Sequence, residues 1–330
     1  MASKSSLKKT TVLFCFASFL LARGIALSSD KNTAAALSHY IVASVYDRQG
    51  ELQKAIPEYK AALKADFENT DIHVGLASTY IKDNNIPKAI EELGLAVKFD
   101  PEAVEPHALL AILYSVQNKT EDANREYEIA LQNASKLEPK NPDIYKTLGV
   151  IYLQQKKYQS ALDMYRIILE LSPGDAQAHF YIADIYEQLH NRPAAERELK
   201  KSLELAPDYA DALNYLGYLY IEENRNLGAA ETMINKALKI EPDNGAYLDS
   251  LGWLYFKKGK TKEAVRLLDR ASILLEDPVI YDHLGDVNFS LRDNQKAILN
   301  WHKSLKLDPS QENVKKKIEA CNTPTPRSKN

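Results

Sequence analysis

The sequence predicts an all-α solenoid of about eight helix-turn-helix repeats, and two observations support this fold class. The first is internal repetition with a period of about 34 residues, which is typical of stacked units rather than of one central core. The second is the apolar spacing within each unit. In residues 142–175, apolar side chains recur three or four positions apart in two stretches, and a polar turn at 155–157 separates them. Each unit therefore contains two amphipathic helices.

The first 24 residues have the three-part pattern of a secretory signal peptide. Three lysines precede the apolar run at 11–21, and small residues follow it. The run is too short for a comfortable transmembrane helix, which needs about 20 apolar residues. We therefore expect residues 1–24 to be removed and the protein to be exported, to the periplasm or the medium if the source is bacterial. The alternatives are an uncleaved membrane anchor and a lipoprotein modified at Cys15.

A short linker, 25–35, leads into the repeat array, which ends at residue 311. The array divides into the repeats 36–69, 70–103, 104–141, 142–175, 176–209, 210–244, 245–277 and 278–311. The eighth position of each repeat is alanine or glycine, at Ala43, Ala77, Ala111, Gly149, Ala183, Gly217, Gly252 and Gly285. A glycine inside a helix costs about 1 kcal/mol relative to alanine. We therefore expect the two helices of a pair to approach closely at this position.

Residues 312–321 form an amphipathic helix that is suited to capping the array, because Val314 and Ile318 lie on one face. Residues 315–317 are three lysines, the one basic cluster in this part of the chain, and we interpret them as a solvated helix face. Residues 322–330 are expected to form a disordered tail.

The recurrent residues resemble those of the tetratricopeptide repeat, whose positions are aromatic, Leu, Gly or Ala, Tyr, Ala, aromatic, Ala and Pro. The clearest copy has Tyr145, Leu148, Gly149, Tyr152, Ala161, Tyr165 and Pro173. The resemblance implies a right-handed superhelix whose first helices line a concave groove for a protein or peptide. The array is also similar to those of bacterial cell-envelope proteins, where such modules help to assemble outer-membrane, secretion or polysaccharide machinery.

In tetratricopeptide arrays, ligand contacts come largely from a few positions of the first helix, and the resemblance places the candidate groove in repeats five to eight. The candidate residues are Phe180, Asp184, Glu187, Asn214, Tyr218, Glu222, Asp249, Trp253, Phe256, Asp282, Asp286 and Phe289. Because they combine aromatic and acidic side chains, we expect exposed aromatic anchors and a net basic ligand with apolar residues. The alternative is that the aromatic residues pack between neighbouring first helices. In members that bind a C-terminal carboxylate, the fifth position is Lys and the ninth is Asn. Among the repeats here only Lys146 fits the fifth position, and its ninth position is Val150, which disfavours such a ligand.

Composition excludes several classes of function. Charged residues make up 26% of the chain and apolar residues 45%, as in a soluble folded protein. Removal of residues 1–24 would delete four basic residues and no acidic one, so the net charge would change from −3 to −7, which argues against binding of nucleic acid. The sequence has no glycine-rich phosphate loop, HExxH or CxxC motif, and about 50 residues lie outside the repeats. We therefore expect neither enzymatic activity nor a cofactor.

The histidines at His39, His73 and His107 recur with 34-residue spacing, a pattern that could suggest a metal site. All three occupy the fourth position of a first helix, as does His179. Neighbouring helices pack about 8–10 Å apart, whereas zinc needs ligands about 2 Å from one ion. We therefore expect these histidines to pack against their own repeat rather than to bind a metal.

The leading hypothesis for function is an exported, non-catalytic scaffold that binds a protein or peptide in its groove, in cell-envelope assembly or secretion. No integral membrane span is expected once the signal is cleaved. The alternative is a structural component that uses its edges to associate with itself, as a homo-oligomer, or with an envelope complex.

Overall fold

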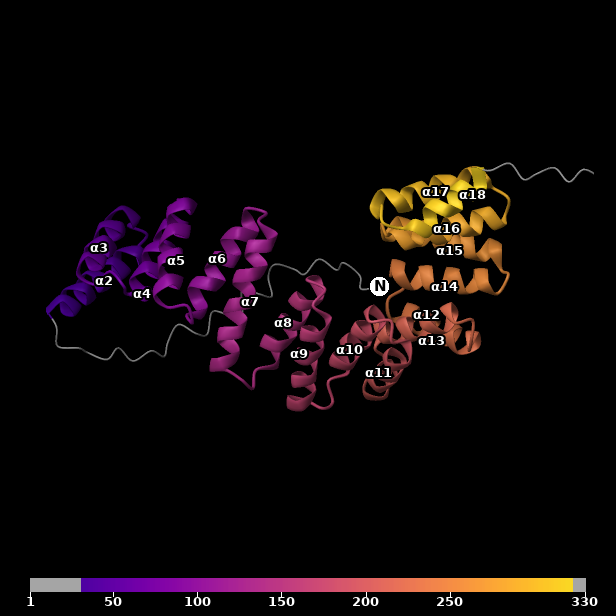
Figure 1. The fold of residues 1–330 in the computed structure, drawn as a ribbon, viewed down its shortest axis with the longest axis horizontal. Coiled ribbons are helices and arrows are strands. Elements are labelled where there is room, and N and C mark those ends of the chain that lie inside the picture. Colours follow the sequence, from indigo (N-terminus) through magenta and orange to yellow (C-terminus); the bar gives the residue numbers. More distant parts are fainter. Residues whose placement is uncertain (1–30, 323–330) are drawn as a thin grey trace, which may run out of the picture. The chain divides into compact units, whose positions relative to one another are not determined.

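The computed structural model describes residues 31–322, and its regular secondary structure there consists of 17 α-helices with no strand. These residues divide into two compact units at the boundary between Leu171 and Ser172, and Figure 1 shows both as series of paired helices. The predicted all-α fold of helix-turn-helix repeats is confirmed. The expected signal peptide at 1–24 lies outside the described residues, as does the tail from residue 323 onwards.

The first unit contains four helix pairs. They are α2 (Lys31–Arg48) with α3 (Leu52–Ala65), α4 (Thr70–Lys82) with α5 (Ile86–Phe99), α6 (Val104–Val116) with α7 (Thr120–Leu137), and α8 (Pro142–Gln154) with α9 (Tyr158–Leu171). The second helix of each of the first three pairs packs against the first helix of the next pair. Because α2 begins at Lys31, the last residues of the expected linker are helical.

The second unit contains four further pairs and a final helix. They are α10 (Ala176–Gln188) with α11 (Arg192–Leu205), α12 (Ala210–Glu222) with α13 (Leu227–Ile240), α14 (Gly245–Lys257) with α15 (Thr261–Leu274), and α16 (Pro278–Ser290) with α17 (Asn294–Leu307). The final helix, α18 (Glu312–Asn322), packs mainly against α17 and caps this unit. Two of its apolar residues, Val314 and Ile318, are buried against Ala297 and Trp301.

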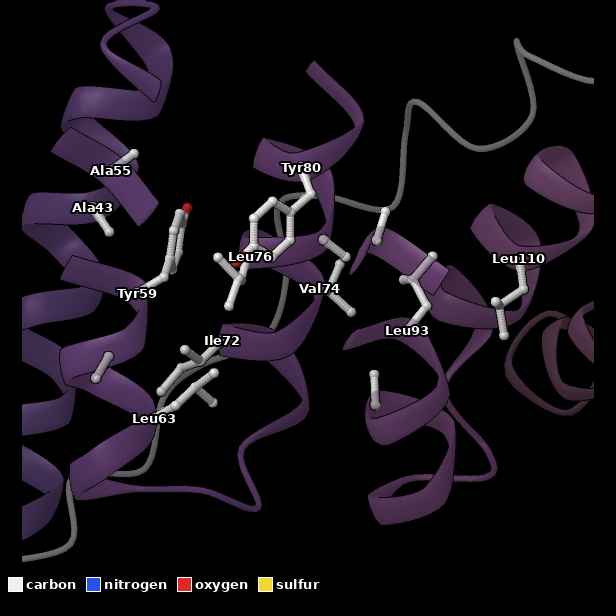
Figure 2. Close-up of a cluster of buried hydrophobic side chains, with 14 of the residues drawn as sticks. Ala43, Ala55, Tyr59, Leu63, Ile72, Val74, Leu76, Tyr80, Leu93 and Leu110 are labelled. Carbon is white, nitrogen blue, oxygen red and sulfur yellow. The ribbon is translucent and has the colours of Figure 1, made fainter. Parts of the chain in front are cut away.

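The core of each unit lies between consecutive helices rather than at one centre. Figure 2 shows such a cluster in the first unit, where residues of α3 such as Tyr59 and Leu63 face residues of α4 such as Ile72 and Leu76. All of these side chains are buried. A helix pair can bury its apolar face only against its neighbours, so stability in each unit builds up from pair to pair.

Small residues let the two helices of a pair approach closely, as the sequence predicts. A Cβ atom added at Gly217 would lie 2.9 Å from a side-chain carbon of Ile234, and one added at Gly252 would lie 2.8 Å from Leu268. Real Cβ atoms essentially never come this close to a neighbour. The helix pairs therefore have no room for a larger side chain at these positions.

The histidines at the fourth position of first helices bond to their own repeat. Nδ1 of His73 lies 2.7 Å from Oε2 of Glu92, and Nε2 lies 2.8 Å from the carbonyl oxygen of Phe67. His39, His107 and His179 also contact a glutamate 19 residues later, at 2.6–2.7 Å. Each ring thus ties the first helix to the second, which confirms the expected packing role.

Candidate functional site

The twelve candidate residues lie on the first helices of the second unit, α10, α12, α14 and α16, and we call this set the first-helix face. Among these helices α12 contacts α14, and α14 contacts α16. Asp184, Asp249 and Trp253 are buried, Glu222 and Phe289 are exposed, and the other seven residues are partly buried. The face is therefore continuous across these helices, and most of its side chains are at least partly buried by their neighbours.

Trp253 of α14 fills the space between its neighbours. Its ring stacks on the ring of His283 in α16, with centroids 4.0 Å apart and planes 11° apart. Its Nε1 donates a hydrogen bond of 2.8 Å to Oε1 of Glu222 in α12. Only 7% of the residue is exposed, so the expectation of an exposed aromatic anchor was wrong at this position. The physical reason is that neighbouring first helices lie close enough for the indole to bridge them.

His283 is a functional candidate that the sequence analysis missed. Its Nδ1 lies 2.9 Å from Oδ1 of Asp249, and both side chains are buried. Burial lowers the pKa of the imidazole, but the carboxylates of Asp249, Asp282 and Asp286 outweigh burial, so its pKa is raised. The 34-residue spacing between Asp249 and His283 is the sequence signal that could have revealed the pair.

The carboxylates of α16 are paired with the capping helix. Nζ of Lys317 lies 2.7 Å from Oδ1 of Asp282 and 2.8 Å from Asp286. Nε1 of Trp301 donates a further hydrogen bond of 3.2 Å to Oδ1 of Asp286. The interpretation of residues 315–317 as a solvated helix face was therefore wrong for Lys317. The cause is the orientation of α18, which turns this lysine towards α16.

The part of the face on α10 and α12 is held by aromatic and polar contacts. The ring of Phe180 lies 5.2 Å from that of Tyr209, and Tyr215 donates a hydrogen bond of 3.5 Å to Asp184. Burial raises the pKa of the Asp184 carboxyl. Nε of Arg192 lies 3.0 Å from Oε1 of Glu187. Phe180 and Asp184 therefore help to join α10 to the following repeat.

Two acceptor atoms on the same part of the face have no partner among the described residues. They are Oε2 of Glu187 and Oδ1 of Asn214, and both atoms are buried. Nearby, burial and then the carboxylates of Glu222 and Asp249 raise the pKa of the Tyr218 hydroxyl. The surroundings are thus rich in acceptors and in negative charge, which suits a ligand that donates hydrogen bonds.

The aromatic residues at the carboxyl-terminal side of the face differ in exposure. The ring of Phe256 lies 5.2 Å from that of Trp253 and is partly buried. Phe289 is 48% exposed, and its ring lies 5.7 Å from that of Trp301. Phe289 is thus the most accessible aromatic residue of the first-helix face.

Residues 31–322 offer neither a metal site nor a membrane-spanning helix. This part of the chain holds no group of three or more His, Cys, Asp or Glu side chains that could bind a metal ion. Within the same residues, each helix is too short or too polar to span a bilayer.

Solved structures share the fold. A tetratricopeptide repeat protein from Parabacteroides merdae matches 77% of this chain and 99% of its own, with a TM-score of 0.59 and 19% identity. The Cut9–Hcn1 hetero-tetramer of the anaphase-promoting complex matches 82% of this chain and 53% of its own, with a TM-score of 0.56 and 18% identity. At these identities the likeness establishes the fold alone.

A curated relative is similar in sequence over a shorter stretch. Anaphase-promoting complex subunit 3 of Schizosaccharomyces pombe is 30% identical over 97 residues, which are 29% of this chain. The matched stretch spans 15% of the length of that subunit. The relatives described here give no support to the expected similarity with bacterial cell-envelope arrays.

Two family descriptions match the chain directly. The tetratricopeptide repeat family matches residues 48–113. The family described as the cilia and flagella-associated protein 70 C-terminal domain matches residues 103–320, which is more than half of the 330 residues. The chain therefore belongs to this tetratricopeptide-repeat family and is a non-catalytic scaffold that binds proteins.

Proposed function

We propose that the first-helix face binds a net basic segment of a partner protein that also carries apolar anchor residues. The observation that carries this proposal is the acidic character of the face. Six carboxylates lie on the same side of four consecutive first helices, at Asp184, Glu187, Glu222, Asp249, Asp282 and Asp286. A surface with charge of one sign attracts a partner of the opposite sign and excludes partners of the same sign.

The carboxylates act together as one negative region. Three of them, Asp249, Asp282 and Asp286, outweigh the effect of burial on the His283 ring and raise its pKa. Lys317 of the capping helix α18 compensates two of these six carboxylates, Asp282 and Asp286. Arg192 contacts Glu187, and Nζ of Lys257 lies 4.6 Å from the centroid of the Trp253 ring. This imbalance favours a basic ligand over an acidic or neutral one.

The apolar part of the interaction is assigned to Phe289 and Phe256 rather than to Trp253. Aromatic residues are enriched among the side chains that dominate binding energy, provided that the partner can reach them. Phe289 is 48% exposed, whereas Trp253 already has neighbours on several sides. A partner would therefore place an apolar residue against Phe289 and its basic residues along the carboxylates.

The experiment that tests this function compares two charge-removing variants. The probe is a short labelled peptide of alternating lysine and leucine, and its counterpart has glutamate in place of lysine. Glu222→Gln removes a charge from the face but keeps an oxygen that can accept the Trp253 hydrogen bond. The control, Glu204→Gln, removes an exposed charge from the second helix α11.

We expect the lysine peptide to bind the wild type, and Glu222→Gln to weaken binding by about twofold to fivefold, as one exposed charge contributes. Glu204→Gln should leave binding unchanged, and the glutamate peptide should not bind. If both variants bind the lysine peptide as tightly as the wild type does, the first-helix face is not the binding surface. Fluorescence anisotropy at two salt concentrations makes this comparison.

Export from the cytoplasm is a further part of the proposal. It rests on the lysines, apolar run and small residues of 1–24, which lie outside the described residues. A role in cell-envelope assembly or secretion would require export. It rests only on the resemblance of the repeat pattern to bacterial cell-envelope arrays, which the relatives reported above do not support. Fractionation of the native source tests both, because a cytosolic pool with an intact N-terminus would refute them.

Self-association through α2 is the second candidate function, and one observation favours it. Ile41, Val42 and Val45 are 53%, 39% and 46% exposed on the first helix of the first unit. Together with exposed Ala35 and Ser38, the two valines form a stripe with spacings of three, four and three residues. This spacing is that of the residues at which two helices pair in a coiled coil, and it reads the same from either end of the helix. A second copy of α2 could therefore pair with the first in antiparallel orientation.

The mass of the protein in solution distinguishes this second function. We expect a dimer whose population rises with concentration, and Val42→Glu should convert it to a monomer. Val116→Glu is the matched control, because Val116 is 71% exposed on α6 and lies outside the stripe. Light scattering that reports a monomeric wild type at every concentration would exclude this association.

A further inference from the structure

We propose that the capping helix α18 competes with the partner for the first-helix face, with Lys317 in the place of a basic side chain of the ligand. This inference rests on the proposed function of the face. It adds that the carboxyl-terminal end of the face is occupied in the free protein and becomes available when α18 releases it.

The contacts of Lys317 are those expected of a bound basic ligand. Its Nζ lies 2.7 and 2.9 Å from the two carboxylate oxygens of Asp282 and 2.8 Å from Asp286. The side chains of Lys317, Asp282 and Asp286 are 30%, 21% and 22% exposed. One ammonium group thus neutralises two of the six carboxylates of the face. Both acids belong to the residues that the family resemblance assigns to ligand binding.

The charge of Lys317 is maintained in this position. Burial lowers the pKa of its ammonium group, but hydrogen bonds and charge interactions with Asp282 and Asp286 outweigh burial and raise the pKa. Burial also raises the pKa of Asp282, which Lys317 counteracts. Each charged group of the ion pair therefore offsets the cost of burying the other. A basic side chain of a partner in the same position could replace the ammonium group of Lys317.

The packing of α18 makes its release feasible. The helix has 11 residues, and isolated helices shorter than about 12–15 residues are marginal in water. Its contacts within the fold are mainly with α17, where Val314 and Ile318 supply the apolar part. Helices such as α14 and α16 pack against several neighbours instead. Elements with few buried contacts open at low free energy and supply switching segments.

A partner could reach the end of the first-helix face that Lys317 occupies, because the surface beside α18 is open. An open hollow is lined by Asp282, by Ser310 and Gln311 of the turn between α17 and α18, and by the first residues of α18 up to Val314. Phe289 lies one turn of α16 after Asp286 and is exposed. A partner could therefore contact the apolar anchor first and then exchange its own basic side chain for Lys317.

Competition of this kind lowers the affinity of the free protein. When only a fraction of molecules has an accessible site, the apparent dissociation constant rises in proportion to the inverse of that fraction. The affinity for a basic ligand would then depend on how firmly Lys317 holds α18 in place. A change that releases Lys317 should strengthen binding, although it removes an ion pair from the fold.

The test is a pair of variants on the same helix. Lys317→Met removes the ammonium group and keeps an unbranched side chain that can pack. Lys316→Met makes the same change of net charge at the neighbouring, exposed position. With the lysine–leucine peptide as probe, we expect Lys317→Met to bind about threefold to tenfold more tightly than the wild type. Lys316→Met should bind the peptide about as tightly as the wild type, because it removes an exposed charge that does not contact the first-helix face.

A second measurement covers the case in which Lys317→Met is poorly folded. Amide hydrogen exchange of residues 312–322 is followed in the wild-type protein with and without the peptide. Displacement of α18 predicts faster exchange in this segment when the peptide is bound. Unchanged or slower exchange overturns the inference, because the helix would then remain docked in the complex.

The outcomes separate this inference from the function on which it rests. If the wild type binds the peptide and Glu222→Gln weakens binding, but Lys317→Met equals Lys316→Met, competition by α18 is wrong and the binding face stands. If the peptide binds none of these proteins, the proposed function fails and the competition fails with it.

Discussion

At the scale of single residues, the first-helix face is largely occupied by its own side chains. Trp253 stacks on His283 and bonds to Glu222, and His283 in turn pairs with Asp249. These contacts join three successive first helices. The accessible residues of the face, such as Phe289, therefore lie at the margins of this network.

Substitution of Trp253 and Phe289 by alanine separates packing from binding. We expect Trp253→Ala to destabilise the protein by about 3–5 kcal/mol, because it leaves a cavity and unpairs Glu222. Phe289→Ala should cost less than about 1 kcal/mol of stability and weaken peptide binding by about tenfold. Urea unfolding and peptide anisotropy measure the two effects. A stable Trp253→Ala protein with lost binding would reverse this assignment.

Stability should fall as the pH rises through the titration of His283. Burial lowers the pKa of this ring, but Asp249, Asp282 and Asp286 raise it above the ordinary value of 6.5. A folded-state pKa above the unfolded one gives stabilisation that is complete below about pH 6.5 and is lost as the pH rises through the folded pKa. Other groups contribute too, including Asp282 with its partner Lys317.

The variant His283→Gln isolates this contribution, because glutamine can still donate a hydrogen bond to Asp249 but does not titrate. The unfolding free energy of the wild type relative to that of the variant should decrease as the pH rises above about 6.5. A difference that is independent of pH would show that the pKa of the ring is the same in the folded and unfolded protein.

At the scale of helices, the repeat tolerates changes of length and of side chain at defined places. The helix α7 has 18 residues, whereas α5 and α9 have 14, and the difference matches the four residues by which the repeat 104–141 is longer than the repeat 142–175. In the turns between paired helices, residues with positive φ include Asn84, Asn118 and Gly259. Asparagine and glycine adopt this left-handed conformation at the lowest cost.

Two glycine-to-alanine substitutions test the close approach of paired helices. At Gly252, an added Cβ would lie 2.8 Å from Leu268 and 3.3 Å from the carbonyl oxygen of Ala264. At Gly94, inside α5, an added Cβ would meet no atom within 4 Å. We expect Gly252→Ala to destabilise by about 1 kcal/mol or more and Gly94→Ala to stabilise by up to about 1 kcal/mol.

The larger substitution Gly252→Leu should cost on the order of 1–3 kcal/mol and extend the same series. Thermal melting of the three variants ranks them. If Gly252→Ala and Gly94→Ala stabilise equally, the helices of this pair do not constrain the eighth position in solution.

At the scale of the whole molecule, stability comes from contacts between neighbouring helix pairs in each unit. The chain is a tetratricopeptide-repeat scaffold, and its family match covers 103–320. Within the second unit, the acidic first-helix face and the capping helix α18 lie close enough for Lys317 to connect them. The capping helix and the first-helix face are therefore in direct contact within one unit.

Export remains a prediction about the complete chain. If the first residues act as a secretory signal, cleavage should fall after Gly24 or Ala26, where small residues follow the apolar run. N-terminal sequencing of the native protein measures the cleavage point. Recovery of a chain that begins at Met1 or Ala2 from a cytosolic fraction would exclude export.

The sequence by itself determined the helices, their pairing and the role of their small residues. These features follow from local rules: apolar residues three and four positions apart set the buried face of a helix. A glycine such as Gly217, which disfavours a helix, persists where a second helix lies against it. The histidines were likewise assigned to packing from their position, although their glutamate partners, such as Glu92 for His73, were not foreseen.

Only the tertiary structure decided which residues of the first-helix face are accessible. The sequence places Trp253 and Phe289 in equivalent kinds of position, but one is 7% and the other 48% exposed. It also gives Lys315 and Lys317 the same chemistry, yet the first pairs with Glu312 of its own helix and the second with two acids of α16. Periodicity fixes the face of a helix on which a side chain lies. The accessibility and charge partner of that side chain depend on the distance and angle to the next helix, which are properties of packing.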